Sequence, residues 1–292
     1  MRYTQLRAFD AVAREASFSE AASRLGLTQP ALTIQVRTLE TAYGTKLFVR
    51  RPGGVDLTKA GRDLFQMTRE LFSVEERIQA FLTGSAGLEQ GELRLSADGP
   101  HLAMELIAAY RRRYPNVTMA IALGNAHDVW RDLIEGRADA VVVANPPETA
   151  GVEVLPIHHR RLSVVVGQDH PWAGRRGLPL KGLAGTPTVL REARSNTRQT
   201  LDRVLSSAGI RLDVVLELGS REATIEAVAA GLGIGFVFEG EVPADPRVAV
   251  VPIKDTGSQI TDTVACLKGE RESAVVDAFF QVASAWKNGK RG

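Results

Sequence analysis

The chain has 292 residues, of which 44% are hydrophobic, and its formal net charge is only +2. This length allows two or three globular units with real cores, and no apolar run is long enough to span a bilayer. A single cysteine, Cys266, excludes an internal disulfide, and no signal peptide precedes the first amphipathic segment. We therefore expect a cytoplasmic protein without a membrane partner.

The small net charge hides an uneven distribution. Residues 1–60 carry nine basic and five acidic side chains, so this segment has a net charge of +4 and the remainder about −2. A basic module on a mildly acidic body is typical of a protein that contacts nucleic-acid phosphates with one end.

The N-terminal segment has the pattern of short helices. Apolar spacing predicts a first helix from Thr4 to about Arg14. Ser17 and Glu20 have the spacing of a capping box, which starts a second helix. Gly26 can end that helix in the left-handed conformation.

A third helix follows at once, because Thr28 can cap it and Pro30 is tolerated in its first turn. Two short helices joined by so tight a turn predict a helix-turn-helix, whose second helix enters the DNA major groove. Its polar face carries side chains suited to base edges and phosphates: Gln29, Thr33, Gln35 and Arg37. The alternative is a helical hairpin with an ordinary solvated face.

Two short strands are predicted next, at residues 47–51 and 55–57, around the turn Pro52-Gly53-Gly54. They would form the wing of a winged helix-turn-helix. Arg50 and Arg51 beside the turn would then reach a phosphate or the minor groove. The same residues also fit an ordinary hairpin.

A long helix is predicted from Thr58 to about Leu82. Apolar side chains recur on it in steps of three and four: Leu64, Met67, Leu71, Val74, Ile78 and Phe81. So narrow a stripe favours a dimer seam over packing on the chain's own domain. The residues that follow, 83–87, read as a linker.

The remainder, from about residue 91, alternates strands and helices. The predicted strands are Leu93–Ala97, Val117–Leu123, Ala138–Ala144, Leu162–Val166, Thr188–Leu190, Val214–Leu218, Ile234–Val237 and Thr263–Leu267. The predicted helices are Leu102–Tyr114, Val129–Glu135, Thr197–Ala208 and Ala223–Leu232. This pattern predicts an α/β unit with mostly parallel strands, in two lobes with a ligand cleft at the carboxyl ends of the strands.

The order of these parts resembles a LysR-type transcriptional regulator. The resemblance rests on SFSEAASRLGLTQPALTIQVRTLE, LFVRR and LTKAG in the first sixty residues, and on REARSNTRQTLD and GSREATIEAVAAGLGIGFV further on. It implies a winged helix-turn-helix over 1–60, a linker helix and hinge over 58–90, and an effector domain over 91–292 similar to two-lobed periplasmic binding proteins. Lobe I would comprise about 91–160 and 264–292, and lobe II about 161–263.

The resemblance also implies partners: an interrupted palindromic operator in double-stranded DNA, a small-molecule effector, a second copy in a homodimer or homotetramer, and RNA polymerase. The DNA-binding residues would be Ser17, Thr28, Gln29, Pro30, Thr33, Ile34, Gln35, Arg37, Arg50 and Arg51. One departure is Ile34, where the family often has a polar residue. Ile34 would contact a thymine methyl or is simply tolerated at the surface.

Effector recognition is expected where helices begin. Ser195, Thr197 and Arg198 start a predicted helix, where free amides and the dipole favour a carboxylate, sulfonate or phosphonate. The alternative is a capping hydroxyl with a surface arginine. The full expected set is Asp98, Gly99, Pro100, His101, Asn125, Asn145, Ser195, Asn196, Thr197, Arg198, Arg221 and Glu222.

Asp98 stands where the family commonly has a hydroxyl residue. A carboxylate in an anion site is costly unless the ligand also carries a cation. Glu222 would serve the same purpose or pair with Arg221. A zwitterion such as an amino acid or an aminophosphonate is therefore expected, and SADGPH, GNAHDV and GSREA are similar to the branch of the family associated with aminoethylphosphonate catabolism.

Other patterns favour structural roles over chemistry. The glycine run at 231–235 follows a helix and precedes a strand, the reverse of a dinucleotide-binding motif, so we read it as a helix end. The five histidines do not have the spacing of metal ligands. The run from His158 to Arg161 is interpreted as a solvated strand edge or hinge. The sequence shows no catalytic cluster. We expect no cofactor, no metal and no enzymatic activity; the alternative is an α/β solute-binding protein or enzyme with an incidental helical N-terminus.

Overall fold

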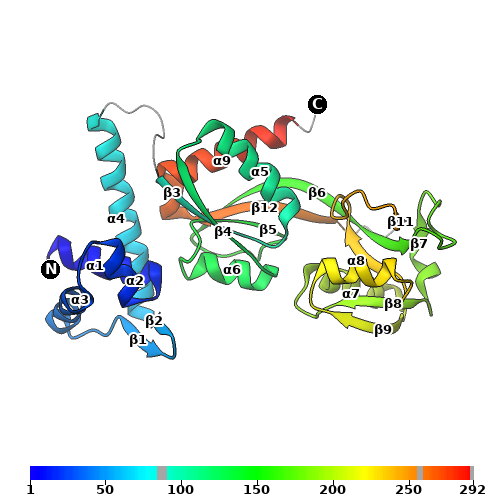
Figure 1. The fold of residues 1–292 in the computed structure, drawn as a ribbon, viewed down its shortest axis with the longest axis horizontal. Coiled ribbons are helices and arrows are strands. Elements are labelled where there is room, and N and C mark those ends of the chain that lie inside the picture. The colour runs from blue at the N-terminus through cyan, green and yellow to red at the C-terminus, as the bar shows by residue number, and fades with distance from the viewer. Residues whose placement is uncertain (84–90, 255–258, 290–292) are drawn as a thin grey trace.

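A computed structural model of the chain describes residues 1–83, 91–254 and 259–289 (Figure 1). The N-terminal head consists of three helices and an antiparallel hairpin, the wing. Its elements are α1 (Tyr3–Glu15), α2 (Phe18–Arg24), α3 (Gln29–Tyr43), β1 (Phe48–Arg51) and β2 (Gly54–Leu57). The head is therefore a winged helix-turn-helix, as the sequence predicts.

Local side-chain chemistry sets the helix-turn-helix. The Ser17 hydroxyl accepts a hydrogen bond from the Glu20 amide (3.3 Å), and the Thr28 hydroxyl accepts one from the Ala31 amide (3.4 Å). These bonds satisfy amides that have no partner inside their own helix. Gly26 has φ +65°, the left-handed conformation that glycine adopts at little cost.

Lobe I is a sheet covered by helices on both faces. Its elements are β3 (Gly91–Ala97), α5 (Pro100–Arg113), β4 (Val117–Leu123), α6 (Ala126–Ile134), β5 (Ala140–Ala144), η2 (Lys268–Glu272) and α9 (Ala274–Gly289). The strand order is β4-β3-β5, continued by the two long strands β12 (Gln259–Leu267) and β6 (Val152–Gly167). Figure 1 shows α5 and α9 on one face of this sheet and α6 on the other, and a separate apolar cluster fills each interface.

Lobe II is built on the far part of β6. Its further elements are β7 (Leu178–Pro179), η1 (Leu180–Leu183), β8 (Pro187–Arg191), α7 (Asn196–Ala208), β9 (Asp213–Leu218), α8 (Arg221–Ala229), β10 (Gly235–Phe238) and β11 (Val248–Lys254). Both β10 and β11 pair antiparallel with β6, whereas β8 and β9 pair parallel with each other. Its core joins α7 and α8 to these strands.

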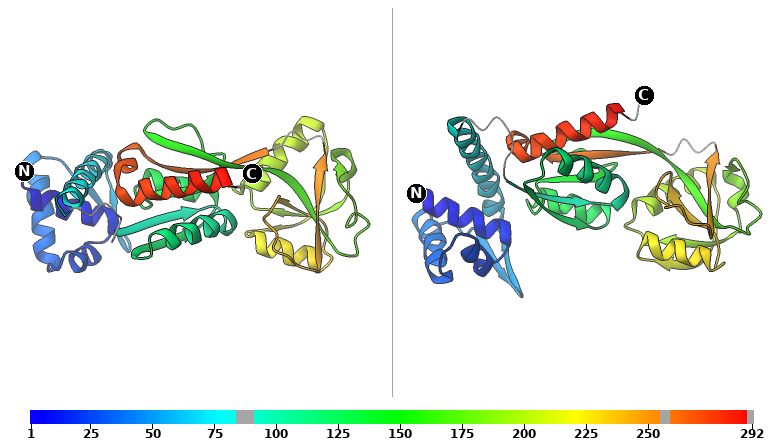
Figure 2. Two further views of the ribbon diagram at one scale, coloured as in Figure 1. Left: turned by 90° about the horizontal axis from the view of Figure 1, so that it is seen from above. Right: turned by 45° about the horizontal axis from the view of Figure 1, so that its top comes forward.

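The two lobes share β6 and β12, which run side by side from one lobe to the other (Figure 2). They pair antiparallel, and their register shifts between Asp262 and Thr263. The expectation of mostly parallel strands is therefore wrong, because β6 and β12 run against their neighbours. The predicted elements do not include α9, β11 or the first half of β6. In the first half of β6, the polar side chains from His158 to Arg161 interrupt the apolar alternation.

The helix α4 (Lys59–Thr83) connects head and effector domain and has two different faces. Phe65 and Thr68 are buried, and Thr68 donates a hydrogen bond to Asp10 of α1 (3.0 Å). The other face carries the α4 stripe: Met67, Leu71, Val74 and Ile78, which are 63%, 44%, 43% and 54% exposed. The side chain of Phe81 and the expected linker beyond Thr83 lie outside the described residues.

A buried ion-pair cluster fixes α4 to lobe I. The Arg69 guanidinium, 2% exposed, contacts Asp139 (2.6 Å), Glu270 and the Gly136 carbonyl (3.2 Å). Arg94 also binds Asp139 (2.8 Å). Burial alone would raise the pKa of Asp139, but the two arginines hold that pKa well below its usual range. α4 and lobe I are thus joined through charges that are costly to separate.

Across the residues that the structure describes, no helix is both long and apolar enough to cross a membrane.

Candidate nucleic-acid interface and effector cleft

The helix α3 presents an exposed face. Leu32, Val36 and Leu39 are buried against the rest of the head, which fixes the rotation of the helix. Gln29 and Arg37 are consequently exposed. They lie two helical turns apart on the same side of α3, with Thr33 between them. The expected contacts Thr28, Pro30, Thr33 and Ile34 lie on the same side or at its edge, and Ile34 is 64% exposed.

A groove of about 550 Å³ lies between α3 and the wing. It brings together six of the residues expected to contact DNA: Ser17, Gln29, Thr33, Arg37, Arg50 and Arg51. Arg51 pairs with Asp56 (3.1 Å), whereas Arg37 and Arg50 form no ion pair with any residue the structure describes. Two unpaired guanidiniums therefore flank a polar helix face, an arrangement that suits phosphates on either side of exposed base edges.

Gln35 differs from the other expected contacts. It is only partly exposed, and its Oε1 is buried without a hydrogen-bond partner among the described residues. Six residues after Gln29, it lies about 240° around the helix, next to the buried stripe. The structure thus places Gln35 at the flank of the exposed face rather than on it.

The candidate effector site is a small cavity of about 20 Å³ where the lobes meet. Residues from both lobes and from both crossing strands line it: Asp98, Asn125, Ala126, Ala144, Arg160, Arg191, Ser195, Asn196, Thr197, Arg221, Phe238, Glu241 and Ile260. This volume holds about one water molecule. The lobes are therefore in contact, and their own side chains fill the site.

Asp98, at the carboxyl end of β3, helps to close the cleft. Its Oδ2 accepts hydrogen bonds from the Ala144 amide (2.9 Å) and from Asn196 Nδ2 (3.2 Å). Asn196 belongs to lobe II and also donates to the Ala144 carbonyl (2.9 Å), so these bonds join the lobes. Burial, reinforced by the nearby carboxylates Asp262 and Glu241, raises the pKa of Asp98 to about 6.

Two arginines form the positive part of the site. Arg160 on β6 makes a double hydrogen bond with Asp262 of β12 (2.6 and 2.7 Å) and contacts Glu241 (2.9 Å). Arg221, the first residue of α8, contacts the same Glu241 oxygen (2.7 Å). Arg221 also lies against Gly99 of lobe I, where an added Cβ would come within 3.2 Å of its guanidinium.

Hydroxyl groups lie beside these charges at the N-terminus of α7. Ser195 and Thr197 are both 4% exposed. The Ser195 hydroxyl makes no capping hydrogen bond to its helix, so it remains available to a bound group. Asn125 lines the cavity from lobe I, although its side-chain oxygen already caps α6 through the Asp128 amide (2.9 Å). Hydroxyls, amides and guanidiniums together provide donors for an oxyanion.

Several expected residues lie outside the cavity. Arg198 turns away from it and binds Asp202 (2.9 Å) and Glu217 (3.2 Å), because a helix side chain one position after Thr197 points about 100° further round. Glu222 is exposed and does not pair with Arg221, whose partner is Glu241.

The remaining expected residues support the cleft from its edge. Asn145, with φ +46°, exchanges hydrogen bonds with the Thr261 backbone (2.8 and 3.0 Å), next to the crossing strands. Pro100 and His101 begin α5 and lie outside the cavity lining. Burial and the nearby Arg221 guanidinium lower the pKa of His101.

Three charged residues of the cleft are not among those expected from the sequence: Arg160, Glu241 and Asp262. Arg160 belongs to the run interpreted as a solvated strand edge or hinge, yet its side chain is only 13% exposed. The one available signal was the pair of basic residues Arg160 and Arg161 ahead of the run 162–166, because a charge at the end of a buried strand requires a partner. Arg160 is the one that is buried, whereas the Arg161 side chain is 66% exposed. Nothing local marks Glu241 or Asp262 as that partner.

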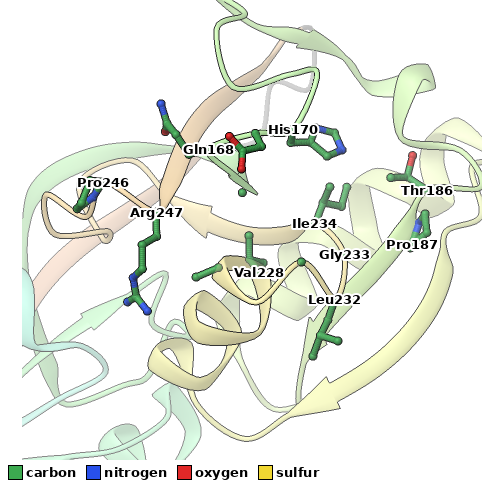
Figure 3. A pocket seen from close by; sticks show the side chains of 14 residues that line it. Gln168, His170, Thr186, Pro187, Val228, Leu232, Gly233, Ile234, Pro246 and Arg247 are labelled. Carbon is green, nitrogen blue, oxygen red and sulfur yellow. The ribbon is translucent and has the colours of Figure 1, made fainter.

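A larger pocket, of about 670 Å³, opens on lobe II away from the cleft. Figure 3 shows Gln168 on one rim and Leu232 on the opposite side. The glycine run at 231–233 forms part of its wall and ends α8, as the sequence predicts. The cation at its rim, Arg247, is already paired with Glu226 (2.7 Å) and Asp245 (2.8 Å).

Within residues 1–83, 91–254 and 259–289, no group of three or more His, Cys, Asp or Glu side chains is placed to hold a metal ion. Cys266 is buried in the core of lobe I, where burial raises the pKa of its thiol to about 12. A thiol with so high a pKa is unreactive at neutral pH.

A winged head on a long helix, followed by two lobes around a polar cleft, defines a DNA-binding regulator with a ligand-binding domain. Two family models match this chain: "Bacterial regulatory helix-turn-helix protein, lysR family" over residues 3–62, and "LysR substrate binding domain" over residues 86–287. The chain belongs to the LysR family of transcriptional regulators.

Individual relatives agree with this assignment. The chain is 34% identical to a RuBisCO operon transcriptional regulator of Allochromatium vinosum over 80% of this chain and 78% of that protein. It shares the fold of a full-length OxyR variant from Pseudomonas aeruginosa (TM-score 0.81, 23% identity, 97% and 94% coverage). The regulatory domain of CcmR from Synechocystis PCC6803, solved in complex with 2-PG, covers 68% of this chain and 99% of its own length (TM-score 0.62, 25% identity).

These relatives are regulators and not enzymes, so the alternative of a solute-binding protein or enzyme with an incidental helical N-terminus is set aside. Their names give no support to the aminoethylphosphonate branch suggested by the sequence.

Proposed function

We propose that this regulator acts in the cytoplasm on an interrupted palindromic operator, which it reads with the groove between α3 and the wing. The observation that carries the proposal is the meeting of six expected contact residues in that groove, with Arg37 and Arg50 unpaired within the described part of the chain. Gln29 and Thr33 read base edges, Ile34 contacts a thymine methyl, and Arg50 binds a phosphate.

Two substitutions separate base reading from phosphate binding. We expect Gln29→Ala to weaken binding to the DNA upstream of the chain's own gene by about 1–3 kcal/mol and to leave a shuffled duplex unaffected. Arg50→Ala should weaken both and lower the salt slope by about one. Fluorescence anisotropy at several salt concentrations measures both effects, with Lys181→Ala on lobe II as a charge-removal control. Equal losses on the two duplexes for Gln29→Ala would contradict its base-reading role.

We further propose that two copies pair through the α4 stripe. The stripe is exposed although its four side chains are apolar, whereas the opposite face of α4 is buried against the chain's own head and lobe I. A second α4 would cover it at coiled-coil spacing. Two such dimers would give the homotetramer, and pairing would present two heads to the two halves of a palindrome.

We propose that the effector is a small anion or zwitterion bound between the lobes. The support is the convergence of Arg160, Arg221 and the Ser195 and Thr197 hydroxyls, together with the 2-PG bound by the CcmR regulatory domain. An aminophosphonate such as 2-aminoethylphosphonate also fits, with its ammonium group facing Asp98. Thermal shift with carboxylates, amino acids, phosphate esters and aminophosphonates tests this. A shift with a simple dicarboxylate but not with any zwitterion would exclude the zwitterionic form.

The mechanism would be a shift in conformational population. An effector with different affinities for the closed and open lobes changes their equilibrium. Because α4 is fixed to lobe I through Arg69, a change in the lobes reaches the helix that carries the head. The spacing of the two heads on DNA, and then contact with RNA polymerase, would follow.

A further inference from the structure

The cleft already contains an anion supplied by the chain itself. Glu241 follows β10 in lobe II, and its Oε1 accepts hydrogen bonds from both Arg160 (2.9 Å) and Arg221 (2.7 Å). Its Oε2 accepts one from the Phe238 amide (2.9 Å), and the side chain is 3% exposed. Burial alone would raise the pKa of Glu241, but Arg221 and Arg160 lower it, so the group is charged at neutral pH.

Glu241 differs from the other acidic partner of Arg160. Asp262 lies on β12, directly across from the strand that carries Arg160, and binds it with two oxygens. That pair belongs to the sheet shared by the two lobes. Glu241 instead follows Gly240, which has φ +82°, in a turn between strands, and its carboxylate is the group that links the two arginines. Of the two carboxylates, Glu241 can therefore move without breaking a sheet.

The cavity has no room for an additional anion. Its volume of about 20 Å³ is smaller than a phosphate or carboxylate group requires, and the hydrogen bonds of Asn196 to Asp98 and Ala144 hold the lobes together. A ligand that uses the two arginines must therefore replace Glu241. The Ser195 hydroxyl, buried and free of a capping bond, lines the same cavity and can donate to a further ligand oxygen.

We propose that Glu241 is an internal anion that holds the place of the effector's anionic group, and that the effector carries a doubly charged oxyanion, such as a phosphate ester, that displaces it from Arg160 and Arg221. The inference rests on the proposed function, because it concerns the same cleft.

The effector needs a double charge because it competes with the Glu241 carboxylate for the two arginines. A tethered carboxylate acts at an effective concentration on the order of millimolar or above. A free monocarboxylate offers the same charge and also loses translational freedom on binding, so it competes poorly. A phosphate dianion offers a larger charge and three acceptor oxygens, which match two guanidiniums and a hydroxyl.

Isothermal titration of the full chain with inorganic phosphate tests the inference. We expect Glu241→Ala to bind phosphate at least about tenfold more tightly than the parent, because the competing carboxylate is gone. Acetate should bind the same variant about tenfold less tightly than phosphate. The matched control is Glu239→Ala, which removes a nearby glutamate that is 38% exposed and whose one polar side-chain partner within the described residues is Arg161. Its phosphate affinity should equal that of the parent.

Two further variants keep the test decisive. Glu241→Gln preserves the side-chain volume and the oxygen that accepts the Phe238 amide, so it should also gain phosphate affinity if the alanine variant fails to fold. Adding Arg221→Gln to either variant should abolish the gain. Equal phosphate affinity in parent and Glu241 variants, or a gain that survives Arg221→Gln, would overturn the inference. Binding of the parent to the upstream DNA is measured alongside. If the parent does not bind this DNA, the proposed function is refuted. If the parent binds the DNA but phosphate affinity is the same in parent and Glu241 variants, the inference alone is refuted.

Discussion

Replacement of Leu71 by glutamate should dissociate the dimer that we propose to form through the α4 stripe. Full burial of a Leu or Met side chain contributes about 1.5–3 kcal/mol, and Leu71 is 44% exposed, so covering it adds about 1 kcal/mol per protomer. Leu71→Glu removes this contribution twice and places two carboxylates in an apolar seam, each of which costs about 1–3 kcal/mol or more. The total of about 4 kcal/mol or more corresponds to a dissociation constant raised about 1000-fold.

Sedimentation over a dilution series measures this change. Gln66→Glu is the matched control, because it adds the same charge to an exposed position of α4 outside the stripe. Circular dichroism should show both variants folded, since Leu71 contributes little to the core of its own chain. A Leu71→Glu chain that sediments like the parent at every concentration would refute the assignment of the α4 stripe as the dimer seam.

Three further outcomes are expected. Arg69→Met should cost about 3–5 kcal/mol in urea unfolding at neutral pH, because it leaves Glu270 buried without its guanidinium, and adding Glu270→Gln should recover part of the loss. Asp98, whose pKa is raised to about 6, contributes stability that is complete below about pH 4 and is lost as pH rises through about 6. Asp98→Asn keeps an oxygen that can accept both hydrogen bonds, so the melting temperature should depend less on pH in that window than it does in the parent; an unchanged pH profile would contradict the assignment. Ile34→Ala should leave the melting temperature unchanged and weaken operator binding by about 1 kcal/mol in anisotropy, whereas unaltered operator binding would make Ile34 a tolerated surface residue.

The head was predictable from sequence because its determinants are local. Ser17 and Thr28 act on amides three residues away, and Gly26 needs only its own backbone freedom. The apolar spacing that buries Leu32 and Val36 also fixes which side chains of α3 face outward. Gln35 was expected on the exposed face of α3 but lies at its flank, because a polar residue type alone does not show how close the residue is to the buried stripe.

Residues of the cleft were predictable from the sequence only where a strand end or a helix start marks them locally. Asp98, Ser195 and Asn196 lie at strand ends and helix starts, where sequence patterns point to binding sites. Arg160 pairs with Asp262 across 102 positions of sequence, through an antiparallel crossing that no local pattern encodes. The same non-local pairing explains why mostly parallel strands were expected.

The central claim is that a basic head reads one DNA sequence in preference to others. Its most direct test is titration of the purified full-length chain, by fluorescence anisotropy at physiological ionic strength, against the DNA upstream of its own gene and a shuffled duplex of equal length. We predict at least about 1000-fold tighter binding to the upstream fragment, as specific DNA-binding proteins show. Equal affinity for the two duplexes, or no binding to either, would contradict the account.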